Sequence, residues 1–288
     1  MKRAVLTIEN TDADTGAGRA GDAIPPAGAR VKLEIKDVVK DFVTARGTTR
    51  ALSDINLSIV EQEFISLIGR SGCGKTTLLR IIAGLIPPTS GEIRIGGKSL
   101  WSGAVVDSSV ITQLGVVFQD ANLFPWYNII DNVSLPLRLR GVSKTDRHRR
   151  ARELMELVGL EGFEKSLPRE LSGGMRQRAA IARALSYDPE LLLMDEPFGA
   201  LDALTRERMN LELQRIAAAI KATVVFVTHD IGEAVFLGSR VVQLTPRPGR
   251  IQNITTVGIP RPRPIEAQSD PRFVQAVRDL RIALDEEV

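Results

Sequence analysis

A short glycine-rich segment carries the residue types that bind phosphate. It runs Gly69-Arg70-Ser71-Gly72-Cys73-Gly74-Lys75-Thr76-Thr77 and matches the pattern G-x-x-x-x-G-K-[ST]. Its glycines let the backbone curl so that successive N–H groups point at phosphate oxygens. Lys75 can reach the β- and γ-phosphates of a nucleotide, and the Thr76 hydroxyl can ligate Mg²⁺. The segment therefore predicts a site for a nucleotide and Mg²⁺.

Four polar residues follow other apolar runs that read as buried strands. Asp195 ends such a run, where a carboxylate can hold Mg²⁺ through water, and Glu196 beside it is placed to act as a general base. Gln119 and His229 also follow predicted strands, at the edge of a parallel sheet where ligands bind. Taken singly, Gln119 and His229 are more typical of ordinary loop residues than of ligand-binding residues.

The elements around these residues alternate between strand and helix. An apolar strand at 64–68 precedes the glycine-rich segment, and a helix follows it up to Gly84, so that the helix N-terminus adds positive charge to the site. Alternating apolar residues near 31–35 and 55–59 predict antiparallel strands, with Phe42 in a loop between them as a core aromatic or a platform for adenine. We expect an α/β fold with a mostly parallel core sheet.

Composition narrows the class of protein. Of 288 residues, 43% are hydrophobic and 25% charged, which is typical of a chain with a full core, and no apolar run approaches the length of a membrane span or a signal peptide. The single cysteine, Cys73, permits no internal disulfide and indicates a small filler residue more than a redox centre. The net charge of +3 suits an anionic nucleotide or a membrane surface and does not require nucleic acid.

A second motif carries a resemblance to a known family. The block Leu171-Ser172-Gly173-Gly174-Met175-Arg176-Gln177-Arg178 resembles the signature motif of ABC-transporter ATPases, and the order of all the motifs is that of the family. The resemblance covers about residues 31 to 250. It implies a P-loop NTPase core with an antiparallel β subdomain and a helical subdomain. It also implies ATP and Mg²⁺ as cofactors.

The resemblance gives each motif residue a role. It implies that Phe42 stacks on adenine, that Gln119 is the Q-loop glutamine and a Mg²⁺ ligand, that Asp202 is the D-loop aspartate, and that His229 is the switch histidine. It further implies a head-to-tail dimer in which Ser172 and the amides of Gly173 and Gly174 cap the γ-phosphate held by the other copy. A helix N-terminus opened by glycines is an anion site, which agrees with this role.

Two stretches resemble one branch of the family, the importers of nitrate, sulfonate and taurine. They are Gln119-Asp120-Ala121-Asn122-Leu123-Phe124-Pro125-Trp126 and Leu244-Thr245-Pro246-Arg247-Pro248-Gly249-Arg250-Ile251. The branch implies transmembrane permease subunits as partners, a solute-binding protein as an indirect partner, and a peripheral place on the cytoplasmic face of the inner membrane. Gln62 departs from the family, because many relatives carry glycine in that turn. The 101–109 segment reads as a loop longer than is common in the branch.

The expected domain organisation follows from these motifs. We predict four parts: a flexible tail over 1–30, an ABC ATPase domain over 31–255, a helical subdomain within it over about 120–185, and a C-terminal extension over 256–288. Two other functions compete with an importer ATPase. A soluble ABC ATPase acting on nucleic acid or ribosomes usually carries two cassettes or a long coiled coil, and this chain has one cassette and no heptad repeat. A phosphate-loop kinase would not need the 171–178 block.

Overall fold

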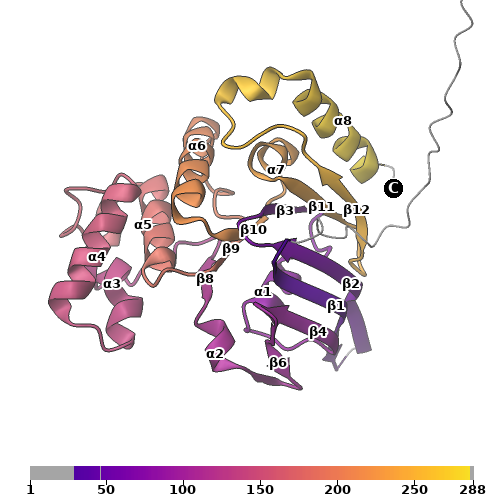
Figure 1. Cartoon of the computed structure of the whole chain (residues 1–288), viewed down its shortest axis with the longest axis horizontal. Coiled ribbons are helices and arrows are strands. Elements are labelled where there is room, and N and C mark those ends of the chain that lie inside the picture. Colours follow the sequence, from indigo (N-terminus) through magenta and orange to yellow (C-terminus); the bar gives the residue numbers. More distant parts are fainter. Residues whose placement is uncertain (1–28, 46, 286–288) are drawn as a thin grey trace, which may run out of the picture.

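The computed structural model describes residues 29–45 and 47–285. The predicted tail over 1–30, except for its last two residues, lies outside the described residues. The core is a six-stranded sheet in the order β12-β11-β3-β10-β9-β8 (Figure 1). Its strands are β3 (Phe64–Ile68), β8 (Leu114–Val117), β9 (Leu191–Asp195), β10 (Thr223–Val227), β11 (Arg240–Leu244) and β12 (Ile251–Thr256). All neighbours pair in parallel except β11 and β12, as the continuous apolar runs predict.

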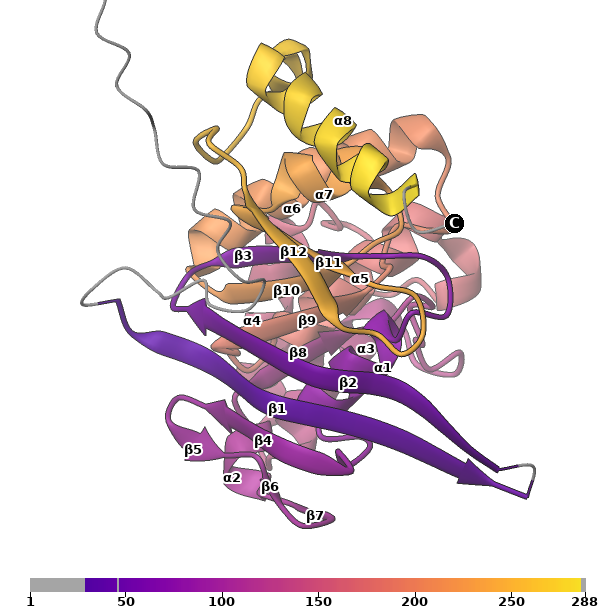
Figure 2. The same cartoon turned by 90° about the vertical axis from the view of Figure 1, so that its right-hand side faces the viewer.

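A second, antiparallel sheet lies beside this core (Figure 2). Its order is β2-β1-β4-β5, with β1 (Val31–Thr44), β2 (Gly47–Val60), β4 (Ser90–Ile95) and β5 (Lys98–Ser99). Apolar residues of this sheet share one buried cluster with α1 (Lys75–Ile82), the helix after the phosphate loop. The sheet therefore holds the loop from one side.

The prediction that Phe42 lies in a loop was wrong. Phe42 belongs to β1 and pairs with Thr49 of β2 in a long hairpin. The apolar alternation breaks there because register shifts interrupt the ladder and Asp37 takes a left-handed φ of 48°. Beyond the shifts the hairpin is held by polar contacts, such as the Arg50–Asp41 ion pair at 2.9 Å, which hydrophobic periodicity does not reveal.

The 101–109 segment also has more structure than the predicted loop. It forms a small hairpin of β6 (Trp101–Ser102) and β7 (Val105–Val106), and α2 (Ser108–Ile111) begins after the capping residue Asp107. The Trp101 indole Nε1 donates to the Ile81 carbonyl at 3.0 Å, which anchors the hairpin to the end of α1. Gln62 adopts a left-handed φ of 62°, so the turn keeps a backbone conformation that favours glycine.

Three helices form a lobe at one end of the core sheet (Figure 1). They are α3 (Ile129–Leu139), α4 (Lys144–Leu157) and α5 (Gly173–Leu185), and α5 follows the short 3-10 helix η1 (Pro168–Glu170). Side-chain caps start each of the three, at Asn128, Ser143 and Ser172. The lobe is tied to the segment after β8, because the Arg183 guanidinium donates to the Ala121 and Asn122 carbonyls at 2.8 and 2.6 Å.

Helices α6 (Ala203–Ile220) and α7 (Ile231–Leu237) continue the core, and the C-terminal extension packs against α7. This extension contains η2 (Ile265–Ser269) and α8 (Pro271–Asp285), of which Phe273 and Leu280 are buried. The start of α7 carries one half of a capping box. The Asp230 carboxylate accepts from the Glu233 amide at 2.9 Å, whereas the Glu233 carboxylate accepts from the Thr228 hydroxyl.

Candidate nucleotide site

The phosphate loop joins the fully buried strand β3 to α1, as the sequence predicts. Gly74 precedes the helix with a left-handed φ of 108°, and a Cβ on it would lie 2.6 Å from the Leu52 side chain. Glycine is therefore required at this position on two grounds. The Lys75 ammonium folds back on the loop and donates to the Gly69 carbonyl at 2.7 Å and the Arg70 carbonyl at 3.3 Å. Its charge thus lies where the loop would receive phosphate oxygens.

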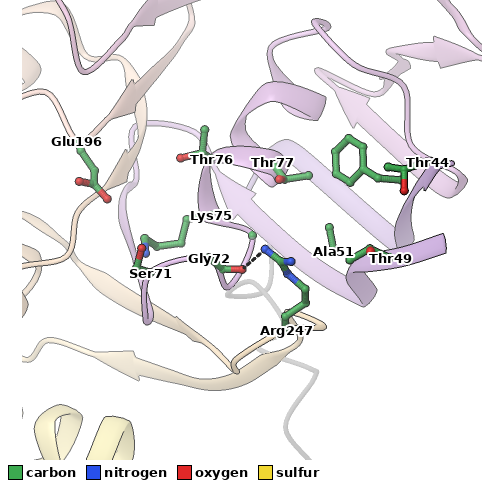
Figure 3. Close-up of a pocket in the computed structure, with 12 residues that line it drawn as sticks. Thr44, Thr49, Ala51, Ser71, Gly72, Lys75, Thr76, Thr77, Glu196 and Arg247 are labelled. Carbon is green, nitrogen blue, oxygen red and sulfur yellow. Dashed lines mark hydrogen bonds between the residues drawn. The ribbon is translucent and has the colours of Figure 1, made fainter. Parts of the chain in front are cut away.

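A cavity of about 400 Å³ opens between this loop and the β1–β2 hairpin (Figure 3). A nucleotide fits a cavity of this size. Phe42 lines it with 40% of its surface exposed, and the Lys40 ammonium lies 5.1 Å from the centre of its ring. The full lining comprises Phe42, Thr44, Thr49, Ala51, Ser71, Gly72, Gly74, Lys75, Thr76, Thr77, Glu196 and Arg247.

A buried carboxylate lies behind the loop at the end of β9. The Thr76 hydroxyl donates to Asp195 Oδ1 at 2.9 Å, and burial raises the pKa of Asp195 above its ordinary value despite that bond. Hydroxyl and carboxylate oxygens are the ligands that Mg²⁺ prefers. No group of three or more acidic, histidine or cysteine side chains suited to a metal occurs in the described part of the chain. The residues thus fit a Mg²⁺ ion that takes its other ligands from phosphate and water.

Glu196 lines the cavity opposite the hairpin and is paired with His229. Glu196 has a left-handed φ of 44°, and its amide donates to the Val227 carbonyl of β10 at 2.9 Å. This bend directs its carboxylate to a different place from that of Asp195. Glu196 Oε2 lies 2.9 Å from His229 Nδ1. The structure therefore brings the two residues together, although they are 33 positions apart in sequence.

The remaining predicted site residues lie outside the lining of the cavity. Gln119 is exposed, two residues after the end of β8. Ser172 caps α5 by accepting from the Met175 amide at 3.3 Å, and Asp202 caps α6 by accepting from the Thr205 amide at 3.0 Å. Interaction with the Thr205 side chain, and then with its amide, lowers the pKa of Asp202 below its ordinary value. Gly173 and Gly174 open α5 beside Ser172, while Gly69, Arg70 and the buried Cys73 form the body of the phosphate loop.

Sequence reasoning missed four residues that line the cavity. Thr44, Thr49 and Ala51 come from the β1–β2 hairpin. Because a loop was predicted at Phe42, the pairing of β1 with β2 in this part of the hairpin was not predicted. Arg247 comes from the turn between β11 and β12. The only signal for Arg247 was its place in a stretch shared with one branch of a family, and that resemblance gave it no role.

These features define the class of protein. The site lies on a parallel sheet and has a glycine loop at a helix N-terminus. A hydroxyl–carboxylate pair and a second carboxylate lie beside the loop. This combination is that of a P-loop NTPase site. Residues 52–199 match the sequence model of the ABC transporter family. The chain therefore belongs to the ABC transporter family.

Relatives named as import ATP-binding proteins cover most of the chain. The nitrate import ATP-binding protein of Synechocystis sp. is 47% identical over 228 residues, 79% of this chain and 83% of the relative. The taurine import ATP-binding protein of Burkholderia pseudomallei is 43% identical and covers 89% of this chain and 96% of the relative. The aliphatic sulfonates import ATP-binding protein of Bacillus cereus is 43% identical, with 82% and 90% covered.

Solved structures agree with the fold. A dimeric bacterial ABC transporter cassette superposes with a TM-score of 0.69 at 37% identity, over 78% of this chain and 98% of that cassette. A post-hydrolysis state of the cassette, bound to ADP and phosphate, gives the same TM-score at 36% identity and the same coverage. In the described part of this chain, every helix is too short or too polar to cross a bilayer.

Proposed function

We propose that this chain is the ATP-hydrolysing subunit of a membrane importer for a small oxyanion-type solute such as nitrate, a sulfonate or taurine. The observation that carries the ATPase assignment is that Glu196, paired with His229, faces the same cavity as Lys75 and Thr76. The solute class rests on the three named relatives and on the two branch stretches.

We propose one role in nucleotide binding for each of these side chains. Phe42 stacks on adenine, the loop amides and Lys75 hold the β- and γ-phosphates, and Thr76 with Asp195 holds Mg²⁺. Gln119 is proposed as a further Mg²⁺ ligand. Bound Mg²⁺ supplies charge neutralisation on the phosphate oxygens.

The chemical step assigned to Glu196 is proton abstraction. Its carboxylate accepts a proton from water as the water oxygen bonds to the γ-phosphorus, and the bond from that phosphorus to the bridging oxygen of ADP breaks. His229 holds the carboxylate through the 2.9 Å contact and reaches the γ-phosphate when ATP is bound. A general base of this kind contributes about 10²–10⁴-fold to the rate.

The assembly proposed here has two kinds of partner. A second copy of the chain supplies Ser172, Gly173 and Gly174 to cap the γ-phosphate in trans, with Asp202 at the contact between the copies. Permease subunits hold the dimer at the cytoplasmic face of the inner membrane as a peripheral protein, and a solute-binding protein acts through the permease. No nucleic acid takes part.

Two variants test the ATPase. Lys75→Ala should weaken Mg-ATP binding by at least tenfold, because it removes a charge-assisted contact worth roughly 1.5–3 kcal/mol. Glu196→Gln should bind Mg-ATP as the parent does but hydrolyse it about 10²–10⁴ times more slowly. Phosphate release and a fluorescent ATP analogue measure the two effects. Turnover by Glu196→Gln at the parent rate would contradict the assignment of Glu196 as the general base. Parent-like ATP affinity in Lys75→Ala would contradict the assignment of the phosphate loop as the ATP-binding site.

A further inference from the structure

The turn between β11 and β12 forms one wall of the nucleotide cavity. Arg247 lies in this turn, and its guanidinium Nη2 donates to the Gly72 carbonyl of the phosphate loop at 3.3 Å. Figure 3 shows the side chain rising from the turn toward the middle of the cavity, between Lys75 and Ala51. Glu196 lies at one end of the cavity and Thr49 at the other. Arg247 therefore lies between the end that contains the proposed general base, Glu196, and the end proposed to bind adenine.

The turn that carries Arg247 is fixed internally. The Thr245 amide donates to the Arg250 carbonyl at 2.9 Å. The Thr245 hydroxyl donates to the Pro248 carbonyl at 3.1 Å and accepts from the Arg250 amide at 2.9 Å. The backbone at Arg247 therefore needs no large rearrangement to present the side chain.

The turn is also fixed against β2 and the phosphate loop. The Gly249 amide donates to the Ala51 carbonyl, and the Gly249 carbonyl accepts from the Ser53 amide, both at 2.9 Å. A Cβ on Gly249 would lie 2.1 Å from the Cys73 carbonyl, so the two backbones touch. The turn keeps its position relative to the loop because this contact leaves no space between them.

The charge of Arg247 is not neutralised by a carboxylate among the described residues, whereas Arg250 of the same turn pairs with Asp54 at 3.3 Å. A guanidinium has five N–H donors in a planar fork, and Arg247 uses one on a carbonyl. The others remain for an anion. A fork of this geometry binds phosphate oxygens in pairs.

We propose that Arg247 is a positioning residue that binds the phosphate chain of the nucleotide between the γ-phosphate and the base. It thereby favours nucleoside di- and triphosphates over the nucleoside. This inference rests on the proposed function of the cavity as an ATP site. The contact adds a fourth support to the nucleotide, beside the loop, Lys75 and Phe42.

Two substitutions separate charge from hydrogen bonding. Arg247→Gln keeps an N–H donor for the Gly72 carbonyl but removes the charge, and Arg247→Lys keeps the charge. Arg250→Gln, in the same turn but paired with Asp54, is the matched control. Affinities for ATP, ADP and adenosine are measured by calorimetry without Mg²⁺, at low and high salt, and melting temperatures are recorded without ligand.

We expect Arg247→Gln to weaken ATP and ADP binding about tenfold, the factor that 1.4 kcal/mol produces, and to leave adenosine affinity and the melting temperature unchanged. Arg247→Lys should recover most of the loss, Arg250→Gln should bind as the parent does, and the loss should shrink in high salt. Parent-like ATP affinity in Arg247→Gln, an equal loss for adenosine, or an equal loss in Arg250→Gln would overturn the proposal.

A parallel titration of Lys75→Ala keeps the two proposals apart. If the parent binds ATP and Lys75→Ala does not, the cavity is the ATP site and the Arg247 results decide the inference alone. If Lys75→Ala binds ATP as the parent does, the proposed function of the cavity fails first, and the inference fails with it.

Discussion

The Asp195 carboxylate is buried and accepts a hydrogen bond from a hydroxyl. Its ionisation is therefore sensitive to whether a cation is bound beside it. Because burial raises its pKa, the folded protein without a metal retains a proton at a pH where the unfolded chain has released it. Proton uptake at Asp195 therefore stabilises the protein as the pH falls, whereas a cation beside the carboxylate favours the charged form. Protons and Mg²⁺ compete at this carboxylate.

We predict that Mg²⁺-dependent ATP affinity falls as the pH is lowered through the raised pKa of Asp195. The measurement is ATP affinity with Mg²⁺ and with a chelator, from about pH 8 down to about pH 4, so that the series begins well above the ordinary carboxyl pKa of about 4 and ends close to it. In Asp195→Asn the contribution of Mg²⁺ to ATP affinity should be small and should not change with pH. A Mg²⁺ contribution in the parent that does not change with pH would contradict the prediction.

At the scale of residues, local motifs were readable from the sequence and distant contacts were not. The glycine loop, Lys75 and Thr76 are contiguous, so their spacing alone places them together. Their own residue types and positions placed Glu196 and His229 only at the ends of predicted strands, and the role expected of His229 came from the family resemblance. Arg247 meets Gly72 across 175 positions, and neither residue's neighbours in sequence indicate the other.

At the scale of elements, a buried arginine adds polar contacts to the packing of the C-terminal extension on α7. Arg263 is 2% exposed, and its Nη1 donates to the Val235, Phe236 and Gly238 carbonyls at 2.8–2.9 Å. The Gln214 side chain binds both the amide and the carbonyl of Arg263, at 2.7 and 3.0 Å. Burial lowers the pKa of Arg263 to about 10, which still leaves it charged at neutral pH. A cation at this helix end satisfies the last carbonyls of α7.

We predict that Arg263→Met lowers the free energy of unfolding by about 3 kcal/mol, because several buried carbonyls lose their donor. Arg278→Met, on the exposed face of α8, is the control and should change it by less than about 0.5 kcal/mol. Denaturant unfolding followed by circular dichroism measures both. Equal stabilities of the two variants would mean that water replaces the guanidinium.

The segment after β8 presents aromatic rings on a fixed backbone. Asn132 accepts from the Phe124 amide at 2.7 Å and donates to the Phe124 and Tyr127 carbonyls at 3.1 and 3.0 Å. Trp126 is nevertheless 69% exposed, with its ring 5.5 Å from that of Phe124. An exposed aromatic on a rigid loop is typical of an anchor for a partner. We propose that the permease contacts this segment, which begins at Gln119.

We predict that Trp126→Ala weakens assembly with the permease about tenfold or more, as the loss of an aromatic anchor does, while ATP affinity stays as in the parent. Val105→Ala, 71% exposed on the β6–β7 hairpin, serves as the control for removal of exposed apolar surface. Copurification with the permease and ATP titration are the two readouts. An equal loss of ATP binding in Trp126→Ala would point to a role in the core instead.

Elements with side-chain caps and continuous apolar runs could be predicted closely. The helix at 203–220 begins after Asp202, whose side chain caps it, and the strand at 223–227 is an apolar run that is buried throughout. The distal part of the β1–β2 hairpin, around 41–50, and the small hairpin at 101–109 could not be predicted, because a polar pair holds the first and an indole hydrogen bond anchors the second, without a periodic apolar face. Hydrophobic patterning detects burial, and these elements are stabilised by other contacts.

At the scale of the whole molecule, the phosphate loop and the Ser172 motif belong to different lobes. Ser172 opens α5 and does not line the cavity that contains Lys75. A second copy placed head to tail can bring Ser172 to a γ-phosphate, which is the arrangement proposed above. The related cassette forms a dimer in its solved structure.

We predict that Glu196→Gln elutes as a dimer from gel filtration in Mg-ATP, since slow hydrolysis preserves the γ-phosphate between the copies and one negative charge is removed. Adding Ser172→Arg should return it to a monomer by blocking the facing phosphate. ADP, which has no γ-phosphate, should also leave the single variant monomeric. A dimer that persists in ADP or with Ser172→Arg would show that the copies meet through another surface.

The contact between Gly249 and the phosphate loop has a consequence for how the protein folds during its synthesis on the ribosome. Once His229 has been translated, the nascent chain contains every sequence motif of the site. The backbone hydrogen bonds of Ala51 and Ser53 can form only after Gly249 has also been translated. Contacts between such distant positions form late, because a long chain must first be ordered. On the ribosome the nascent chain therefore carries a recognisable but unfinished site. The wall that includes Arg247 is completed only after the turn beyond β11 has left the exit tunnel.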